Sequence, residues 1–111
     1  MKTKIAGLTQ YKQKVINLVT KLVAAEFSIN EKELFVKSRA TKHSIPRKVA
    51  AGILRKVYNI QYQMIADYYG YRSHASVGYA VRSLDKALVE DVEISQIITN
   101  VMKNVKKELQ K

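Results

Sequence analysis

Residues 61–89 read QYQMIADYYGYRSHASVGYAVRSLDKALV, and this stretch decides the fold that we predict. Its first part is a short helix pattern with Ile65 and Tyr68 facing inward. Gly70 follows at the position after a helix end, where a left-handed backbone is favoured. Ser73 then suits the N-cap of a second helix, to about residue 89, because its hydroxyl can accept from the unpaired N–H groups of a first turn. Two helices joined by a tight turn predict a helix-turn-helix.

The second helix of this pair, about residues 73–89, has one apolar and one polar face. Its apolar residues recur at i, i+4, i+7 and i+11, which predicts a buried stripe of Val77, Val81, Leu84 and Leu88. The opposite face is predicted to expose Ala75, Ser76, Tyr79 and Arg82, with His74 at the tip. In DNA-binding proteins of this type the first residues of the second helix enter the major groove. Helix pairs are also general packing units, so the motif needs support from the charge distribution.

Positive charge gathers in one segment of the chain. The 111 residues carry a formal net charge of +11. Residues 37–56 contain seven Lys or Arg and no acid, whereas residues 85–111 contain five residues of each sign. A basic surface attracts the nucleic-acid backbone through the release of bound counterions. Because the charge is local rather than spread, we expect a DNA-binding face rather than a surface that is basic only for solubility.

The remaining segments are predicted to be helical as well. Residues 37–44 form a polar basic loop in this interpretation, and Pro46 suits the first turn of the helix that follows it. Gly52 within that helix indicates close packing against a neighbouring helix. Since no segment alternates with period two, we predict an all-α fold of about six helices in one domain over residues 1–111. Besides the helix pair, the expected helices cover residues 8–27, a short turn at 30–35, 46–58 and 91–109.

Composition argues against several other classes of protein. The chain has no cysteine and only two histidines, so we expect no disulfide, metal or cofactor. No apolar run approaches the roughly 18 residues of a membrane span, and no signal peptide begins the sequence, which favours the cytoplasm. We find no nucleophile with a nearby base and no paired carboxylates, so we do not expect an enzyme. The tyrosines between residues 58 and 71 are expected mostly to pack in the core rather than to stack on bases.

Two blocks of sequence resemble a known family. MIADYYGYRSHASVGYAVRSL, residues 64–84, is similar to the pattern I-G-x-x-F-G-G-R-D-H-T-T-V-x-x-A-x-x-K-I of the C-terminal DNA-binding domain of the bacterial replication initiator DnaA. ELFVKSRATKHSIPRKVA, residues 33–50, is similar to that family's basic loop and the Pro-Arg-Gln opening of its next helix. The resemblance spans about residues 15–109. It implies a Trp-repressor-like helical fold that binds double-stranded DNA at a short A·T-rich box as a monomer.

The resemblance also implies roles for single residues. Arg39 matches the family's minor-groove arginine, and a narrow A·T-rich minor groove attracts arginine through its negative potential. Arg47 matches the arginine beside the proline, and Arg55 falls where the family has a basic residue that can meet phosphate. Arg72 and His74 match the turn and the start of the recognition helix. The full candidate set for DNA binding is Arg39, Lys42, Arg47, Lys48, Arg55, Arg72, Ser73, His74, Ala75, Ser76, Tyr79 and Arg82.

Several positions depart from the family pattern. Ser73 replaces an aspartate that suits the cytosine amino group, Ala75 replaces a threonine but keeps a methyl group for thymine, and Lys48 replaces a glutamine. No Gly-x-x-x-x-Gly-Lys-Ser/Thr motif occurs, so the family's ATPase module is not expected here. We therefore expect a freestanding DNA-binding domain with a regulatory role in replication or transcription. The alternative is a protein-interaction module that kept the fold and lost its specific DNA contacts.

Overall fold

The computed structural model describes residues 2–35 and 41–110, with side chains described for residues 10–35 and 44–110. Within these ranges the chain is helical and contains no strand, which confirms the all-α prediction. No helix in the described ranges is long and apolar enough to cross a membrane. The elements are α1 (Lys2–Glu26), the 3₁₀ helix η1 (Glu31–Phe35), α2 (Thr41–Lys56), α3 (Tyr62–Tyr69), α4 (His74–Glu90) and α5 (Val92–Leu109).

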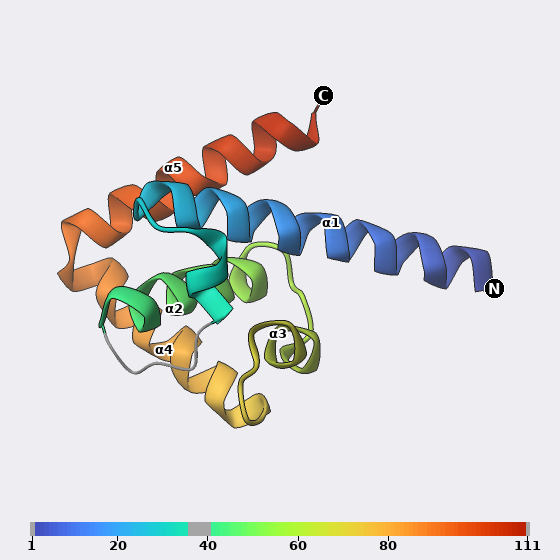
Figure 1. Ribbon diagram of the computed structural model, residues 1–111, viewed down its shortest axis with the longest axis horizontal. Helices are drawn as coiled ribbons and strands as arrows, with labels where there is room; N and C mark the ends of the chain where they lie inside the picture. The colour runs from blue at the N-terminus through green and yellow to red at the C-terminus, as the bar shows by residue number, and fades with distance from the viewer. Residues whose placement is uncertain (1, 36–40, 111) are drawn as a thin grey trace.

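Helix α2 is the centre of the arrangement. It contacts every other helix and η1, while α1 and α5 pack side by side along one side of the bundle (Figure 1). The N-terminal turns of α1 project beyond the other helices (Figure 1). The core lies where these helices meet, and its largest fully buried side chains include Ile16, Leu34, Ile53, Leu54, Ile60, Ile65, Val77 and Val101.

The helix-turn-helix consists of α3 and α4, with the ends that the sequence predicts. Gly70 ends α3 in the left-handed conformation, with φ of 73° and its N–H donating to the carbonyl of Ala66. Ser73 is the N-cap of α4, and its Oγ accepts from the N–H of Ser76 at 3.4 Å. The predicted extent of the recognition helix is therefore confirmed.

The fully buried tyrosine of α3 is Tyr69, whereas Tyr68, which was predicted to face inward, packs against the core and stays partly exposed. Tyr69 is 2% exposed, and its phenol oxygen lies 2.6 Å from the hydroxyl of Thr20. That Thr20 hydroxyl donates to the carbonyl of Ile16 at 2.7 Å, so Tyr69 is the donor between the two side chains. Tyr68 is only half-buried and donates to Asn17 at 2.8 Å. A buried phenol needs a partner, and Thr20 provides one to Tyr69.

The basic segment is more helical than predicted. Helix α2 begins at Thr41, so residues 41–44 are helical and not part of the predicted loop, and Pro46 lies beyond the first turn. A proline at such a position removes one backbone hydrogen bond of the helix. Pro46 is buried, so its ring also packs in the interior.

Leu88 is more exposed than the predicted stripe of α4 implied. It is 36% exposed, whereas Val77, Val81 and Leu84 of the same predicted stripe are buried. Leu88 lies at the rim of the core, in a hollow that it shares with Val57 just beyond the end of α2. Helix α4 therefore extends past the end of α2, and Leu88 is left partly exposed.

Candidate nucleic-acid interface

A hollow of about 690 Å³ lies between α2, the turn after α3 and the start of α4. Helix α2 contributes the cations Arg47 and Lys48, and α4 contributes small side chains that face them. None of the described residues that line this hollow is acidic. The lining residues are Ser44, Arg47, Lys48, Tyr71, Ala75, Ser76, Tyr79 and Ala80. We call this surface the basic hollow.

The start of α4 presents its side chains to solvent on one wall of the basic hollow. Ala75 is exposed and Tyr79, one turn further on, is 68% exposed. His74 is exposed at the tip and hydrogen-bonds the side chain of Gln63 on α3. This bond ties the tip of the recognition helix to the first helix of the pair. The unpaired N–H groups of a helix start also favour a negatively charged group such as phosphate.

Tyr71 belongs to the basic hollow although the sequence pattern suggested a core residue. Burial raises the pKa of Tyr71 to about 12, and the nearby charge of Arg47 acts in the opposite direction. The phenol therefore keeps its proton at neutral pH and can both donate and accept. Its position directly after Gly70, at the turn into the recognition helix, is the signal that could have identified it. Ser44 and Ala80 also line the basic hollow but were not predicted as site residues, and no sequence signal distinguishes them from other small residues.

Arg55 and Arg82 make contacts within the protein. The Arg55 Nη1 donates to the carbonyl of Ile60 at 3.3 Å, and its guanidinium carbon lies 4.5 Å from the centre of the Tyr62 ring. These contacts hold Arg55 at the corner between α2 and α3. Arg82 is exposed, and its guanidinium extends back along α4 towards Gly78. The predicted DNA contacts of both arginines remain predictions.

The other candidates fall at the edges of the described structure. Arg72 is exposed in the turn before α4. Arg39 lies outside the described residues, and Lys42 lies on the first turns of α2 with a side chain that is not described. The structure therefore brings together Arg47, Lys48, Ala75, Ser76 and Tyr79 in one hollow, with Arg72, Ser73 and His74 at the helix start beside it.

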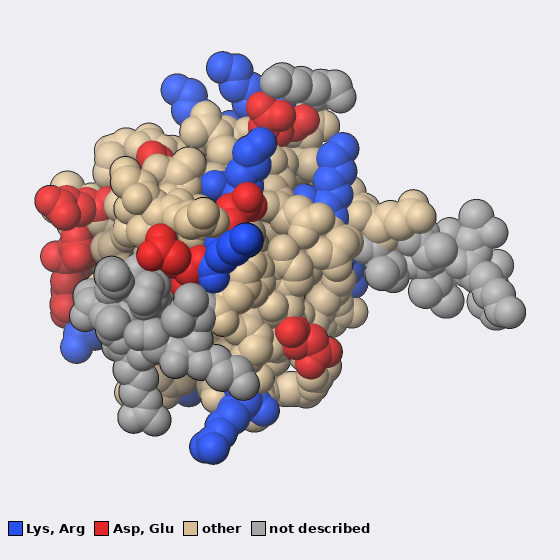
Figure 2. Space-filling view, in the orientation of Figure 1, with Lys and Arg blue, Asp and Glu red and all other residues tan. Residues whose placement is uncertain are grey.

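Charge is divided between the two ends of α4. Glu90, Asp91 and Glu93 are exposed at the corner between α4 and α5, and Figure 2 shows acidic side chains gathered at the left edge over this corner. Basic side chains occupy the lower edge of the same view, near the start of α4. The recognition helix thus begins in a basic region and ends in an acidic one.

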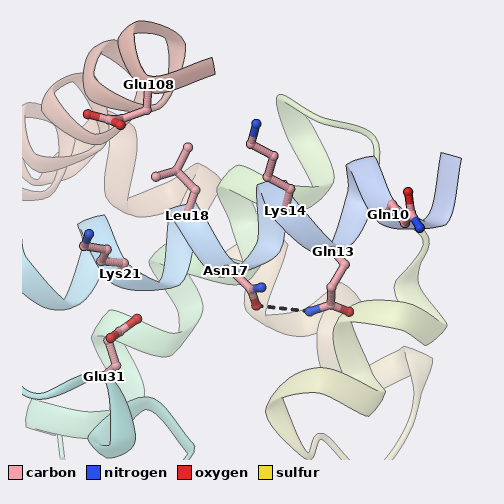
Figure 3. Close-up of a pocket in the computed structure, with 8 residues that line it drawn as sticks. All are labelled: Gln10, Gln13, Lys14, Asn17, Leu18, Lys21, Glu31 and Glu108. Atoms are coloured by element: carbon pink, nitrogen blue, oxygen red, sulfur yellow. Dashed lines mark hydrogen bonds between the residues drawn. The ribbon is translucent and has the colours of Figure 1, made fainter. Parts of the chain in front are cut away.

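A second hollow of about 550 Å³ lies between α1, η1 and α5 (Figure 3). Two lysines and two glutamates line it, so unlike the basic hollow it has no excess of positive charge. Gln13 donates to Asn17 at 3.1 Å along α1 (Figure 3). The lining residues are Gln10, Gln13, Lys14, Asn17, Leu18, Lys21, Glu31 and Glu108.

A pair of helices joined by a turn occurs in many unrelated proteins, and comparison with known proteins shows to which family this pair belongs. A model of the bacterial DnaA protein helix-turn-helix matches residues 16–84, which include both walls of the basic hollow. The chain belongs to this bacterial DnaA helix-turn-helix family. The domain of this family is a DNA-binding, non-catalytic fold.

Individual DnaA proteins show the same relationship. The chain is 37% identical over 84 residues to the chromosomal replication initiator protein DnaA of Nautilia profundicola, covering 74% of this chain and 19% of that protein. It is 30% identical over 94 residues to the DnaA protein of Geotalea uraniireducens, covering 85% of this chain and 20% of that protein. The chain therefore spans about a fifth of the length of these initiators.

Proposed function

We propose that this protein binds double-stranded DNA with sequence selectivity. The start of α4 enters the major groove, and the basic residues between 37 and 48 lie against the backbone and minor groove. One observation carries the proposal: the basic hollow combines the cations Arg47 and Lys48 with the exposed start of α4, inside the part of the chain that matches the DnaA family. A helix start in the major groove beside phosphate-binding cations is how helix-turn-helix proteins bind DNA.

The side chains of the hollow suggest which base edges are recognised. The Ala75 methyl suits the methyl group of thymine, and the Ser73 and Ser76 hydroxyls can donate or accept. None of the described residues that line the hollow has a carboxylate that could accept from a cytosine amino group. An A·T-rich box remains compatible with this set, with weaker discrimination than an Asp-Thr pair would give.

The biological role that we propose is regulation of replication or transcription. The relatives are named chromosomal replication initiators, and this chain carries no phosphate-loop motif. One DNA-binding domain over residues 1–111 that acts in the cytoplasm fits these observations.

Fluorescence anisotropy on two labelled duplexes tests the proposal. One duplex carries the family's A·T-rich box, the other carries the same bases in scrambled order, and both are titrated across a salt series. We expect tighter binding to the box, with a preference that persists as salt weakens the shared phosphate contacts. Equal affinity for the two duplexes that is lost as salt rises would mean that the protein binds phosphate only and does not recognise the sequence. Absence of binding to both duplexes at low salt would favour the protein-interaction module.

A further inference from the structure

Exposed apolar side chains gather at the end of the bundle away from the basic hollow. Among the described residues, eight large apolar side chains are exposed, and five of them are Val57, Leu88, Val89, Val92 and Met102. Val57, Leu88 and Met102 line one hollow of about 280 Å³, where the ends of α2 and α4 meet α5. Val89 and Val92 are 87% and 84% exposed at the adjoining corner. A gathering of exposed apolar groups marks an interaction surface.

Helix α5 and its N-cap Asp91 carry a regular row of residues, of which Ser95, Thr99 and Met102 line this hollow. Asp91, Ser95, Thr99, Met102 and Lys106 follow each other at spacings of four, four, three and four, which places them on one side of the helix. All five are exposed or half-buried. The row begins with an acid, has small hydroxyl residues in the middle and ends with a lysine. We call these five residues the α5 row.

The α5 row of one copy is complementary to the α5 row of a second copy that runs in the opposite direction. If two copies of the helix lie antiparallel with Thr99 opposite Thr99, then Asp91 lies within one residue of the level of Lys106 of the other copy, and Ser95 lies within one residue of the level of Met102. The small Ser95 and Thr99 let the two helices approach, and each Met102 can enter the hollow beside Leu88 of the other copy. A two-fold interface has this property, because residue i contacts residue j and residue j contacts residue i.

We propose that a second copy of this chain covers this surface through an antiparallel pairing of the two α5 helices. The match between the acidic start and the basic end of the row favours a second copy over an unrelated partner. The pairing also leaves DNA binding free. The α5 row begins at Asp91, directly after the C-terminal end of α4 and about 25 Å along that helix from the recognition tip. Two copies would therefore present two separate basic hollows, in contrast to the monomer that the family resemblance implied.

A cross-link at the two-fold axis tests the pairing directly. The chain has no cysteine, so Thr99→Cys introduces a single thiol at the position that would face itself. We expect this variant of the full chain to form an intermolecular disulfide under mild oxidation, because the paired Cα atoms would lie within reach of one. Asn104→Cys is the matched control: it is exposed on α5, about 200° around the helix from Met102. Cross-linking at 99 that is no faster than at 104 would overturn the proposal.

Sedimentation equilibrium of the reduced protein provides the second test. The wild-type chain should dimerise in a concentration-dependent way. Met102→Glu and Lys106→Glu should each raise the dimer Kd by at least about tenfold, since each places an unmatched charge in the interface. Asn104→Glu and Lys107→Glu are the matched controls, because they make the same two changes of charge at positions outside the α5 row. They should change the dimer Kd by less than about threefold. Far-UV circular dichroism and DNA binding verify that each variant is folded. A wild-type chain that stays monomeric up to about millimolar concentration, or equal effects of paired variants, would contradict the proposal.

Discussion

A Cβ atom added to Gly52 of α2 would lie 1.9 Å from Cδ2 of Leu84 on α4. A Cβ on residue 52 therefore fits only if the Leu84 side chain moves. This contact is one point at which α4 packs closely on α2, the helix that carries Arg47 and Lys48 of the basic hollow. The glycine that the sequence predicted to serve close helix packing has this role, and the packing positions the recognition helix.

Gly52→Ala is expected to lower the free energy of unfolding by about 1–2 kcal/mol, because Leu84 must leave its position in the core. Alanine would otherwise favour the helix by about 1 kcal/mol. Urea denaturation measures the change. In a double-mutant cycle with Leu84→Ala, the combined cost should be smaller than the sum of the two single costs. A higher free energy of unfolding for Gly52→Ala would contradict this prediction, because it would mean that α2 and α4 accommodate the added methyl group without a loss of packing.

Tyr69→Phe is expected to destabilise the fold by about 1 kcal/mol, since it removes the donor to the buried hydroxyl of Thr20. Tyr68→Phe is the matched control on the same helix. Its hydroxyl bonds Asn17 at an exposed site, so its cost should stay within about 0.5 kcal/mol. Equal costs for the two variants would contradict the assignment of the Tyr69–Thr20 bond as the buried, stabilising link between α3 and α1.

Alkaline pH should weaken the fold through its buried tyrosines. Burial raises the pKa of Tyr71 to about 12 and raises that of Tyr69 further, against an ordinary value of 10.0. Above pH 10 the unfolded chain releases phenol protons that the folded chain still holds, so the free energy of unfolding falls as pH rises from 10 towards 12. Denaturation curves between pH 8 and about 11.5 measure this slope. Tyr71→Phe should flatten the slope, and an unchanged slope would exclude Tyr71 as a cause.

Arg47→Ala is expected to weaken binding to both duplexes and to reduce the dependence of log K on log salt by about one unit. The reason is that the Arg47 guanidinium borders the basic hollow, where phosphate is expected to lie. Lys21→Ala removes the same charge from α1, next to the second hollow, and should leave both the affinity and the salt slope nearly unchanged. Equal losses for the two variants would mean that only the net charge of the protein matters.

Local signals explain what could be predicted from the sequence. Gly70, Ser73 and Asp91 mark helix ends because their own backbone or side chain completes the end, and all three do so. Asp91, for example, accepts from the N–H groups of Glu93 and Ile94 at 3.0 and 3.2 Å. The buried stripe of α4 also followed from spacing alone as far as Leu84.

Features that depend on distant neighbours could not be predicted in this way. Tyr68 and Tyr69 are adjacent tyrosines in the sequence, and only the position of Thr20 on α1 determines which one is buried. Leu88 continues the apolar spacing of α4, yet the described helices beside it leave it 36% exposed. Tyr71 borders the basic hollow because α2 passes beside the turn. Each of these outcomes is set by the packing of separate helices and not by the residue's own segment.

The most direct test of the account locates the two ends of α4 on bound DNA. Because the chain has no cysteine, Ala75→Cys and Val89→Cys can each carry a DNA-cleaving iron chelate, at the exposed start and the exposed end of the helix. Both are measured on the box duplex at protein concentrations that saturate it by anisotropy. We expect the chelate at position 75 to cut within the box, in the staggered pattern of a major-groove reagent, and the chelate at position 89 to leave the duplex intact. Cleavage from position 89, or equal cleavage from both positions, would contradict recognition by the start of α4.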